Sequence, residues 1–159
     1  MILRNIPNCL ANICTVFWVG GTWAIGYIAA PVLFKTLPDK QLAGLLAGTM
    51  FTWMAFFGLG CAAYLLAYQV YQFGREAVKQ KGFILVATML ILVLIGQFGI
   101  QPVMVDLKAQ AFPVDVMQSA LASQFKALHG LASILYLLQS LLGVVFVITQ
   151  VSNKFARPR

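Results

Sequence analysis

The chain has 159 residues, of which 61% are apolar and only 9% are charged, and its mean hydropathy is +0.87. Soluble domains are typically about 45–50% apolar and about 25% charged, so this composition excludes a water-soluble globular, disordered or coiled-coil protein. The net charge is +7, but the basic residues form no face with interleaved aromatics, which excludes a nucleic-acid partner. The sequence therefore predicts an integral membrane protein whose main partner is the lipid bilayer.

Four long stretches of the chain contain no charged residue: 5–34, 41–74, 82–105 and 127–153. About 20 apolar residues in a helix cross the hydrocarbon core, so each stretch fits one span. Continuous apolarity favours helices over the alternating strands of a membrane barrel. We therefore expect an all-α membrane protein, a four-transmembrane-helix bundle that forms a single domain over residues 1–159. We place its helices near 9–32, 42–71, 83–103 and 128–150.

The basic residues predict the orientation of the bundle. With four spans, the two termini and the middle loop share one side of the membrane. That side carries one acid, Glu76, and the bases Arg4, Arg75, Lys79, Lys81, Lys154, Arg157 and Arg159. The other side carries fewer bases and most of the acids. Because basic loops stay in the cytoplasm, we expect both termini there and a multi-pass protein of a bacterial inner membrane.

Small residues along the first two helices suggest close helix packing. In lipid, close backbone contact rather than a hydrophobic gain drives helix association, and small residues permit that contact. The candidates for packing are Gly20, Gly21, Gly26, Pro31, Gly44 and Gly48. Gly44 and Gly48 form a GxxxG pair that packs either on the first helix or against a second copy. Pro31 and Pro102 mark the ends of the first and third helices, and each precedes valine, so a two-plus-two repeat is possible.

Polar residues inside the spans are costly and mark candidate sites. On the fourth helix, His129, Ser133, Tyr136, Ser140 and Gly143 share one face, and on the first helix Asn8, Asn12, Thr15, Thr22 and Gly26 share another. The predicted site is a polar cluster near the outer leaflet, formed by His129, Gln97, Gln101, Ser133 and Asp106, the last in a long outer loop near 104–127. In that loop, Asp115 is a possible N-cap of an amphipathic segment that lies at the interface or closes the bundle as a lid.

Metal and cofactor chemistry has few candidate residues. Met50, Met54 and Cys61 follow one stripe of the second helix, and their sulfur atoms suit Cu(I), but the first and last are about 16 Å apart along the axis. His129 is the only histidine, so one copy cannot supply two histidine ligands to haem. No nucleophile, metalloprotease or phosphate-binding motif occurs. We therefore predict no cofactor and no catalytic residues.

Several segments together resemble a known family. The first helix reads Trp18-Val-Gly-Gly21 and then Gly26-Tyr-Ile-Ala-Ala-Pro31-Val-Leu-Phe34-Lys35, and it is followed by Leu37-Pro38, Leu42-Ala-Gly44, Gly48 and Phe51. Later segments are Gln101-Pro102 with Lys108, and Phe125-Lys-Ala-Leu-His129-Gly130 with Ser133. Over about residues 10–150 this order resembles the transmembrane protein 205-like family. The resemblance implies a four-helix membrane domain without an assigned reaction, and it supplies no catalytic residues to carry over.

The function that these features favour is that of a non-enzymatic inner-membrane protein, which associates with its own copies or with a membrane partner. One alternative is a transporter or binding protein for a small cation or a soft metal, which would use the outer polar cluster or the Met50 and Met54 stripe. A second alternative is a haem-binding membrane protein. The small-residue stripes and the lack of reactive constellations favour the first of these hypotheses.

Overall fold

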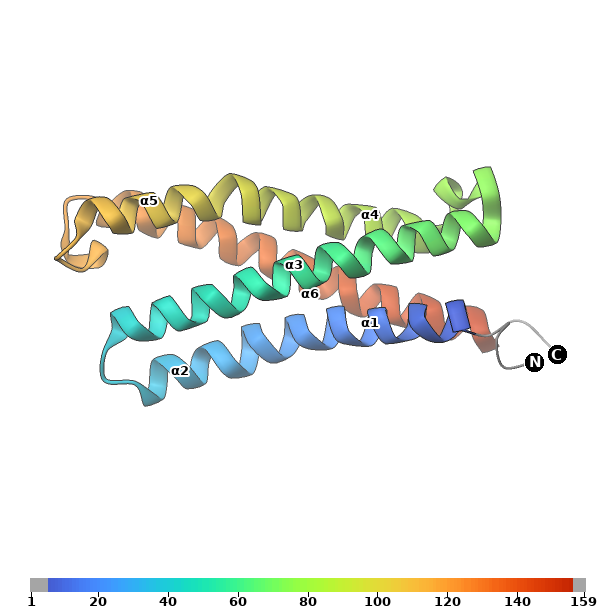
Figure 1. Cartoon of the computed structure of the whole chain (residues 1–159), viewed down its shortest axis with the longest axis horizontal. Coiled ribbons are helices and arrows are strands. Elements are labelled where there is room, and N and C mark those ends of the chain that lie inside the picture. Colours follow the sequence, from blue (N-terminus) through green and yellow to red (C-terminus); the bar gives the residue numbers. More distant parts are fainter. Residues whose placement is uncertain (1–5, 156–159) are drawn as a thin grey trace.

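The computed structural model of the chain describes residues 6–155, and their side chains up to residue 151. Of the described residues, 92% are helical and none lies in a strand. Four helical rods lie side by side as an elongated bundle (Figure 1). The protein is therefore the all-α, four-helix bundle that the composition predicts, and each rod is long and apolar enough to cross a membrane.

The first rod consists of α1 (Ile6–Ala24), a π-helical segment (Ile25–Ala29) and α2 (Ala30–Thr36). The second rod is α3 (Lys40–Phe73), which is followed by a 3-10 turn (Gly74–Lys79). The third consists of α4 (Lys81–Leu94), a second π-helical segment (Ile95–Ile100) and α5 (Gln101–Ala111). The fourth is α6 (Ala122–Phe155), which is preceded by a short 3-10 turn (Val116–Gln118). Each rod contains the span predicted for it and continues past both ends of that span.

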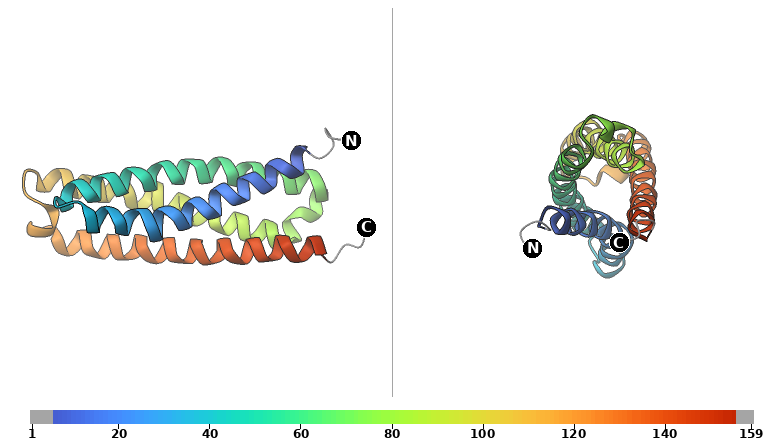
Figure 2. Two further views of the ribbon diagram at one scale, coloured as in Figure 1. Left: turned by 90° about the horizontal axis from the view of Figure 1, so that it is seen from below. Right: turned by 90° about the vertical axis from the view of Figure 1, so that its right-hand side faces the viewer.

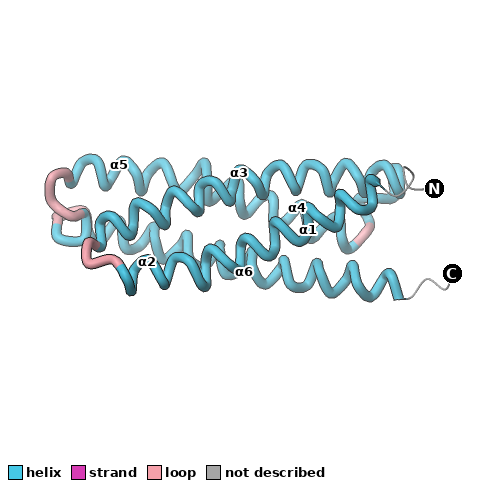
Figure 3. Tube along the Cα trace, turned by 60° about the horizontal axis from the view of Figure 1, so that its bottom comes forward, coloured by secondary structure: helices cyan, strands magenta, loops and turns pink. Residues whose placement is uncertain are grey.

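Consecutive rods run antiparallel, so the bundle has two distinct ends. The start of α1, the Gly74–Lys79 turn and the finish of α6 lie together at what we call the terminal end (Figures 1 and 2). The two other connections lie at the opposite end, which we call the loop end (Figure 3). Near the loop end, α6 packs on α5 whereas α2 packs on α3, so the first and fourth rods diverge (Figure 1).

Both π-helical segments stand just before a proline. Pro31 lies in the first turn of α2, and Pro102 lies in the first turn of α5. Proline lacks the N–H that an α-helix requires, and its ring collides with the carbonyl four residues earlier. A wider π turn accommodates this defect without ending the helix. The first and third rods therefore share a wide turn at equivalent places, next to the two Pro-Val pairs.

The main core lies in the terminal half of the bundle, where all four rods contribute. Its largest fully buried side chains include Trp18, Leu65, Met89 and Phe146, from four different rods. A smaller cluster of Leu107, Val116 and Phe125 closes the loop end.

The long outer loop predicted over 104–127 is shorter than expected, because α5 continues to Ala111 and α6 starts at Ala122. Asp106 is therefore helical rather than part of a loop. Asp115 caps the short turn as predicted, since its carboxylate accepts the Met117 amide at 2.7 Å. Val116 of this turn is buried with Leu107 of α5 and Phe125 of α6, so the segment packs on the ends of these two helices, as a lid would.

Candidate functional site

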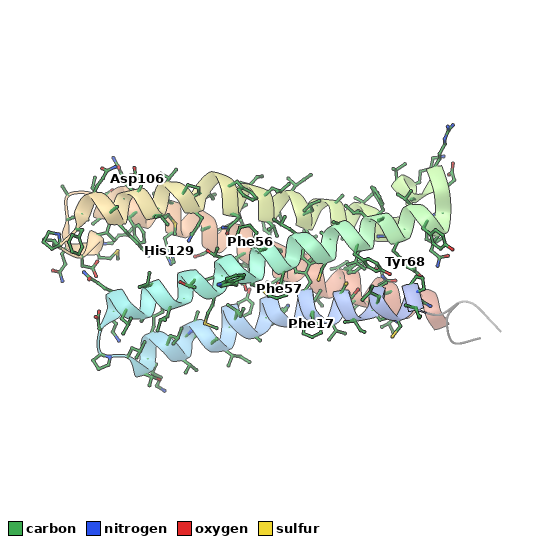
Figure 4. The ribbon with its side chains drawn as sticks, viewed as in Figure 1. Phe17, Phe56, Phe57, Tyr68, Asp106 and His129 are labelled. Carbon is green, nitrogen blue, oxygen red and sulfur yellow. The ribbon has the colours of Figure 1, made fainter. Side chains whose placement is uncertain are left out.

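Within residues 6–151, the hydrogen bond from Ser133 to the His129 carbonyl is the only one between members of the predicted polar cluster. Asp106 is exposed on α5 and accepts a hydrogen bond from Gln110 of the same helix at 2.7 Å (Figure 4). His129 is exposed on α6, and its ring stacks on Phe125 one turn earlier. Ser133 donates to the backbone carbonyl of His129 at 2.8 Å, so its hydroxyl is used within the helix. These contacts stay within single helices, and across residues 6–151 none connects the third rod to His129 or Ser133.

The divergence of the rods explains why the polar face of α6 is divided. Tyr136, Ser140 and Gly143 face the first rod in the packed half of the bundle, where Val19 lies against Gly143. His129 and Ser133 follow the same face, but they lie toward the loop end, where the first and fourth rods diverge (Figure 1). A helical face predicts which side chains point the same way, but it does not predict how far a neighbouring helix covers them.

The predicted packing glycines have different surroundings. Carbon atoms added to Gly21 and Gly26 would collide with Met54 and Tyr136, respectively, so both glycines permit close packing. Gly44 faces Phe34 of the first rod, at 3.7 Å from such a carbon, and Gly48 faces the Gln101 amide of the third rod at 3.9 Å. The GxxxG pair thus points into the chain's own bundle. Gly20 has no neighbour within 4 Å, because it lies on the exposed side of α1.

The stripe of soft ligands does not form a three-ligand metal centre. The Met54 sulfur packs toward Gly21, whereas Cys61 lies two helical turns away and faces Cys14 of the first rod. Among residues 6–151, no group of three or more His, Cys, Asp or Glu side chains is close enough to hold a metal ion. The contact between Cys14 and Cys61 is a feature that the sequence pattern did not reveal, because nothing in the spacing of α1 relates it to α3.

A different polar cluster joins the first and fourth rods, and we call it the aromatic–polar cluster. It consists of Thr22, Trp23, Gly26, Tyr27, Tyr136 and Ser140. The Trp23 indole donates to the Ser140 carbonyl at 3.2 Å, and the Tyr27 and Ser140 hydroxyls are 2.7 Å apart. Because Ser140 donates its own proton to the Leu137 carbonyl at 2.8 Å, Tyr27 is the donor in the pair. The cluster forms the interhelical hydrogen bonds of this interface.

The Tyr136 hydroxyl enters the first rod where the π turn begins. It donates to the Thr22 carbonyl at 2.6 Å, and the tyrosine ring lies against Gly26. In a regular α-helix the Gly26 amide would bond to this carbonyl, so the tyrosine hydroxyl uses the acceptor of that step in the ladder. Phe51 supports the Tyr136 ring edge-on, with centroids 5.0 Å apart. Two features therefore stabilise the wide turn: Pro31, which lacks a backbone N–H, and the Tyr136 hydroxyl from α6.

Sequence reasoning identified part of this cluster. The polar stripes on the first and fourth helices contain Thr22, Gly26, Tyr136 and Ser140, but their pairing depends on which helices become neighbours. Trp23 and Tyr27 carried no signal, because aromatic residues are common in membrane spans. The cluster offers hydroxyl and indole groups that are already paired with protein acceptors. It can therefore lock two helices together, and it contains no pair of groups arranged for acid–base or nucleophilic chemistry.

A family model described as a domain of unknown function, DUF4149, matches residues 13–113 of the chain. The chain belongs to this family. No curated protein and no solved structure matches it. The DUF4149 match covers both π-helical segments and ends just before the short turn at Val116–Gln118, so Tyr136 and Ser140 lie outside it.

The Tyr27–Ser140 pair of this DUF4149 protein gives a measurable coupling. We expect Tyr27→Phe and Ser140→Ala each to lower the free energy of unfolding in bicelles by about 0.6 kcal/mol, the average for interhelical hydrogen bonds in membranes. The double variant should lose less than the sum, because either change alone removes the shared bond. Strictly additive losses in the double-mutant cycle would show that the two hydroxyls contribute independently.

Proposed function

We propose that this DUF4149 protein acts in the membrane by binding other membrane proteins, foremost its own copies, and not by catalysis. The observation that carries this proposal is the use of the buried polar side chains. Of the five buried polar side chains in the described part of the chain, four donate to a backbone carbonyl of their own helix: Thr15, Thr22, Gln69 and Ser140. The half-buried Tyr136 donates to the first rod. These paired groups support helix packing and leave little for recognising a substrate.

The exposed side of α3 supplies a surface for association, which we call the small-residue face. It consists of Gly60, Ala63 and Ala67, which are exposed and lie about one turn apart. Helices associate in lipid where small residues let two backbones approach closely. Two aromatic side chains, Phe56 and Phe57, precede this face on α3 and are 48% and 67% exposed (Figure 4). We infer that a second copy packs here.

An association measurement in native lipid tests this proposal. The protein is extracted in copolymer nanodiscs and its mass is measured, with Ala63→Leu as the disrupting variant and Ala24→Leu, at an exposed alanine of α1, as the matched control. We expect oligomers for the unaltered chain and for the control, and a shift toward monomers for Ala63→Leu, because leucine prevents close backbone contact. Monomers throughout, without any other protein in the disc, would contradict the proposal.

The orientation that we propose places the terminal end of the bundle in the cytoplasm of a bacterial cell, with the bundle in the inner membrane. Arg75, Lys79 and Lys81 lie at this end, and the acid there, Glu76, pairs with Lys79 at 2.9 Å. This basic excess supports a cytoplasmic location.

Reporter fusions test the orientation. We expect a fluorescent protein fused after residue 78 or after residue 159 to be active, and alkaline phosphatase at either position to be inactive. After residue 113, at the loop end, alkaline phosphatase should be active and the fluorescent protein should be inactive. Opposite behaviour at residues 78 and 159 would contradict the placement of both at one face.

We also propose that the kinship of the chain extends to the transmembrane protein 205-like family. Most of the segments that carry this resemblance, from Trp18 to Lys108, lie within the residues matched by the DUF4149 model. The segment from Phe125 to Ser133 lies beyond it, on the exposed part of α6. The shared four-helix architecture supports the relationship without adding a reaction to it.

A further inference from the structure

The interface between α1 and α3 has a register that independent contacts define. A carbon atom added to Gly58 would lie 2.5 Å from the Trp18 indole nitrogen, so these two residues face each other. Three residues further along α1, Gly21 faces the sulfur of Met54, four residues earlier on α3. The two helices are antiparallel, so a step of three residues forward on α1 corresponds to a step of four residues back on α3.

The same register continues toward the terminal end, where the Tyr68 hydroxyl donates to the Asn8 side chain at 3.1 Å. Between this contact and the Trp18–Gly58 contact, it places Cys14 opposite Cys61. Both thiols pack against the same core cluster, which contains Trp18 of α1 and Leu65 of α3.

Small residues bring the two backbones together beside the thiols. Ala11 is 3% exposed and Ala62 is 0% exposed, and both belong to the core on which Cys14 and Cys61 pack. Disulfides require a short separation between the two Cα atoms, and small residues at a helix crossing allow the backbones to approach. Cys9 is different, because it is exposed.

The thiol pair lies inside the apolar span. At 1.5 Å per residue, Cys14 lies about 12 Å from the start of α1 at Ile6, and Cys61 lies about 18 Å from the end of α3 at Phe73. Both side chains are half-buried rather than enclosed. Because they lie inside apolar spans, we infer that their exposed part meets lipid rather than water. Charged products are disfavoured at this depth, whereas a disulfide is neutral.

We propose that Cys14 and Cys61 form a redox-active dithiol, which closes to an interhelical disulfide when an apolar two-electron acceptor of the quinone class reaches it in the bilayer. The two S–H bonds break and one S–S bond forms. The two protons and two electrons pass to the quinone, which becomes the quinol. The disulfide then ties the first rod to the second, next to the Trp18–Gly58 contact.

Counting free thiols in the full chain tests this proposal. The protein is reconstituted in liposomes and treated with diamide or with decylubiquinone, then denatured and alkylated with N-ethylmaleimide before its intact mass is measured. The chain has three cysteines, and we expect the number of alkylated thiols to fall from three to one with either oxidant. Tris(carboxyethyl)phosphine should restore all of them, and peptide mapping should show a link between the segments that contain Cys14 and Cys61.

Three serine variants locate the reacting pair. Cys9→Ser is the matched control and should lose both remaining thiols on oxidation, whereas Cys14→Ser and Cys61→Ser should keep both of theirs. Full alkylation of the unaltered chain after diamide, or covalent dimers joined through Cys9, would overturn the proposal. Closure by diamide but not by decylubiquinone would overturn the assignment of a quinone as acceptor.

Discussion

Replacing Trp18 by alanine is expected to cost more stability than any other single substitution considered for this protein. Trp18 is 1% exposed and packs in the core between α1 and α3. Removing a buried aromatic ring of this size typically costs about 3–5 kcal/mol, because the cavity left behind loses its packing contacts. We expect a loss in this range in the free energy of unfolding, measured by SDS titration in bicelles.

The chain contains a matched control for this substitution. Trp53 lies on α3 and is 63% exposed, so Trp53→Ala should change the unfolding free energy by much less. Equal losses for the two tryptophans would show that Trp18 is not a core residue. Trp18→Phe is informative as well, because the indole N–H has no acceptor among the residues described. Phenylalanine should retain much of the stability, since it fills most of the space without adding an unpaired donor.

The same contact can be tested from the other helix. A carbon atom added to Gly58 would lie 2.5 Å from the indole nitrogen, whereas Gly60 has no neighbour within 4 Å. Gly58→Ala should therefore push the helices apart, and Gly60→Ala should not. Because the two glycines are two residues apart on one helix, the change in helix propensity is the same for both.

Gly26→Ala is expected to disrupt the contact at the π turn. The added carbon atom would collide with the Tyr136 ring, whose hydroxyl donates to the Thr22 carbonyl. Overpacking of this kind costs about 1–3 kcal/mol, and the displaced hydroxyl leaves its backbone partner unpaired. We expect Gly26→Ala to lower the unfolding free energy by about 1–3 kcal/mol in bicelles.

Gly20→Ala is the control for this prediction, because nothing lies within 4 Å of Gly20 on the same helix. A second control removes the ring that causes the collision. The double variant Gly26→Ala with Tyr136→Ala should lose less than the sum of the two single losses, because the clash needs both partners. If Gly26→Ala behaves like Gly20→Ala, Tyr136 does not insert at the wide turn.

The predicted polar site shows where sequence reasoning reached its limit. The period of an α-helix correctly placed His129, Ser133, Tyr136 and Ser140 on one face of α6. The outer pair lies exposed and the inner pair lies in the bundle, because the first and fourth rods diverge toward the loop end (Figure 1). That divergence depends on how the rods cross, which the periodicity of a single helix does not reveal.

The cysteines illustrate the same limit between helices. Cys14 and Cys61 are 47 positions apart in the sequence, and neither belongs to a local motif. Their contact follows from the register of α1 on α3, which large and small side chains set together at Trp18–Gly58 and Gly21–Met54. This match of large and small side chains can be recognised only when the facing surfaces of α1 and α3 are both known.

The amino-acid sequence by itself determined that this protein is a membrane protein with four helices. Long uncharged stretches can satisfy their backbone groups in lipid only by forming helices, so composition and charge spacing are sufficient for that conclusion. Only the tertiary structure decided which polar side chains meet, where the rods diverge and which thiols face each other. Those features depend on side-chain packing between rods, and in lipid many pairings of equally apolar helices are compatible with the same hydropathy.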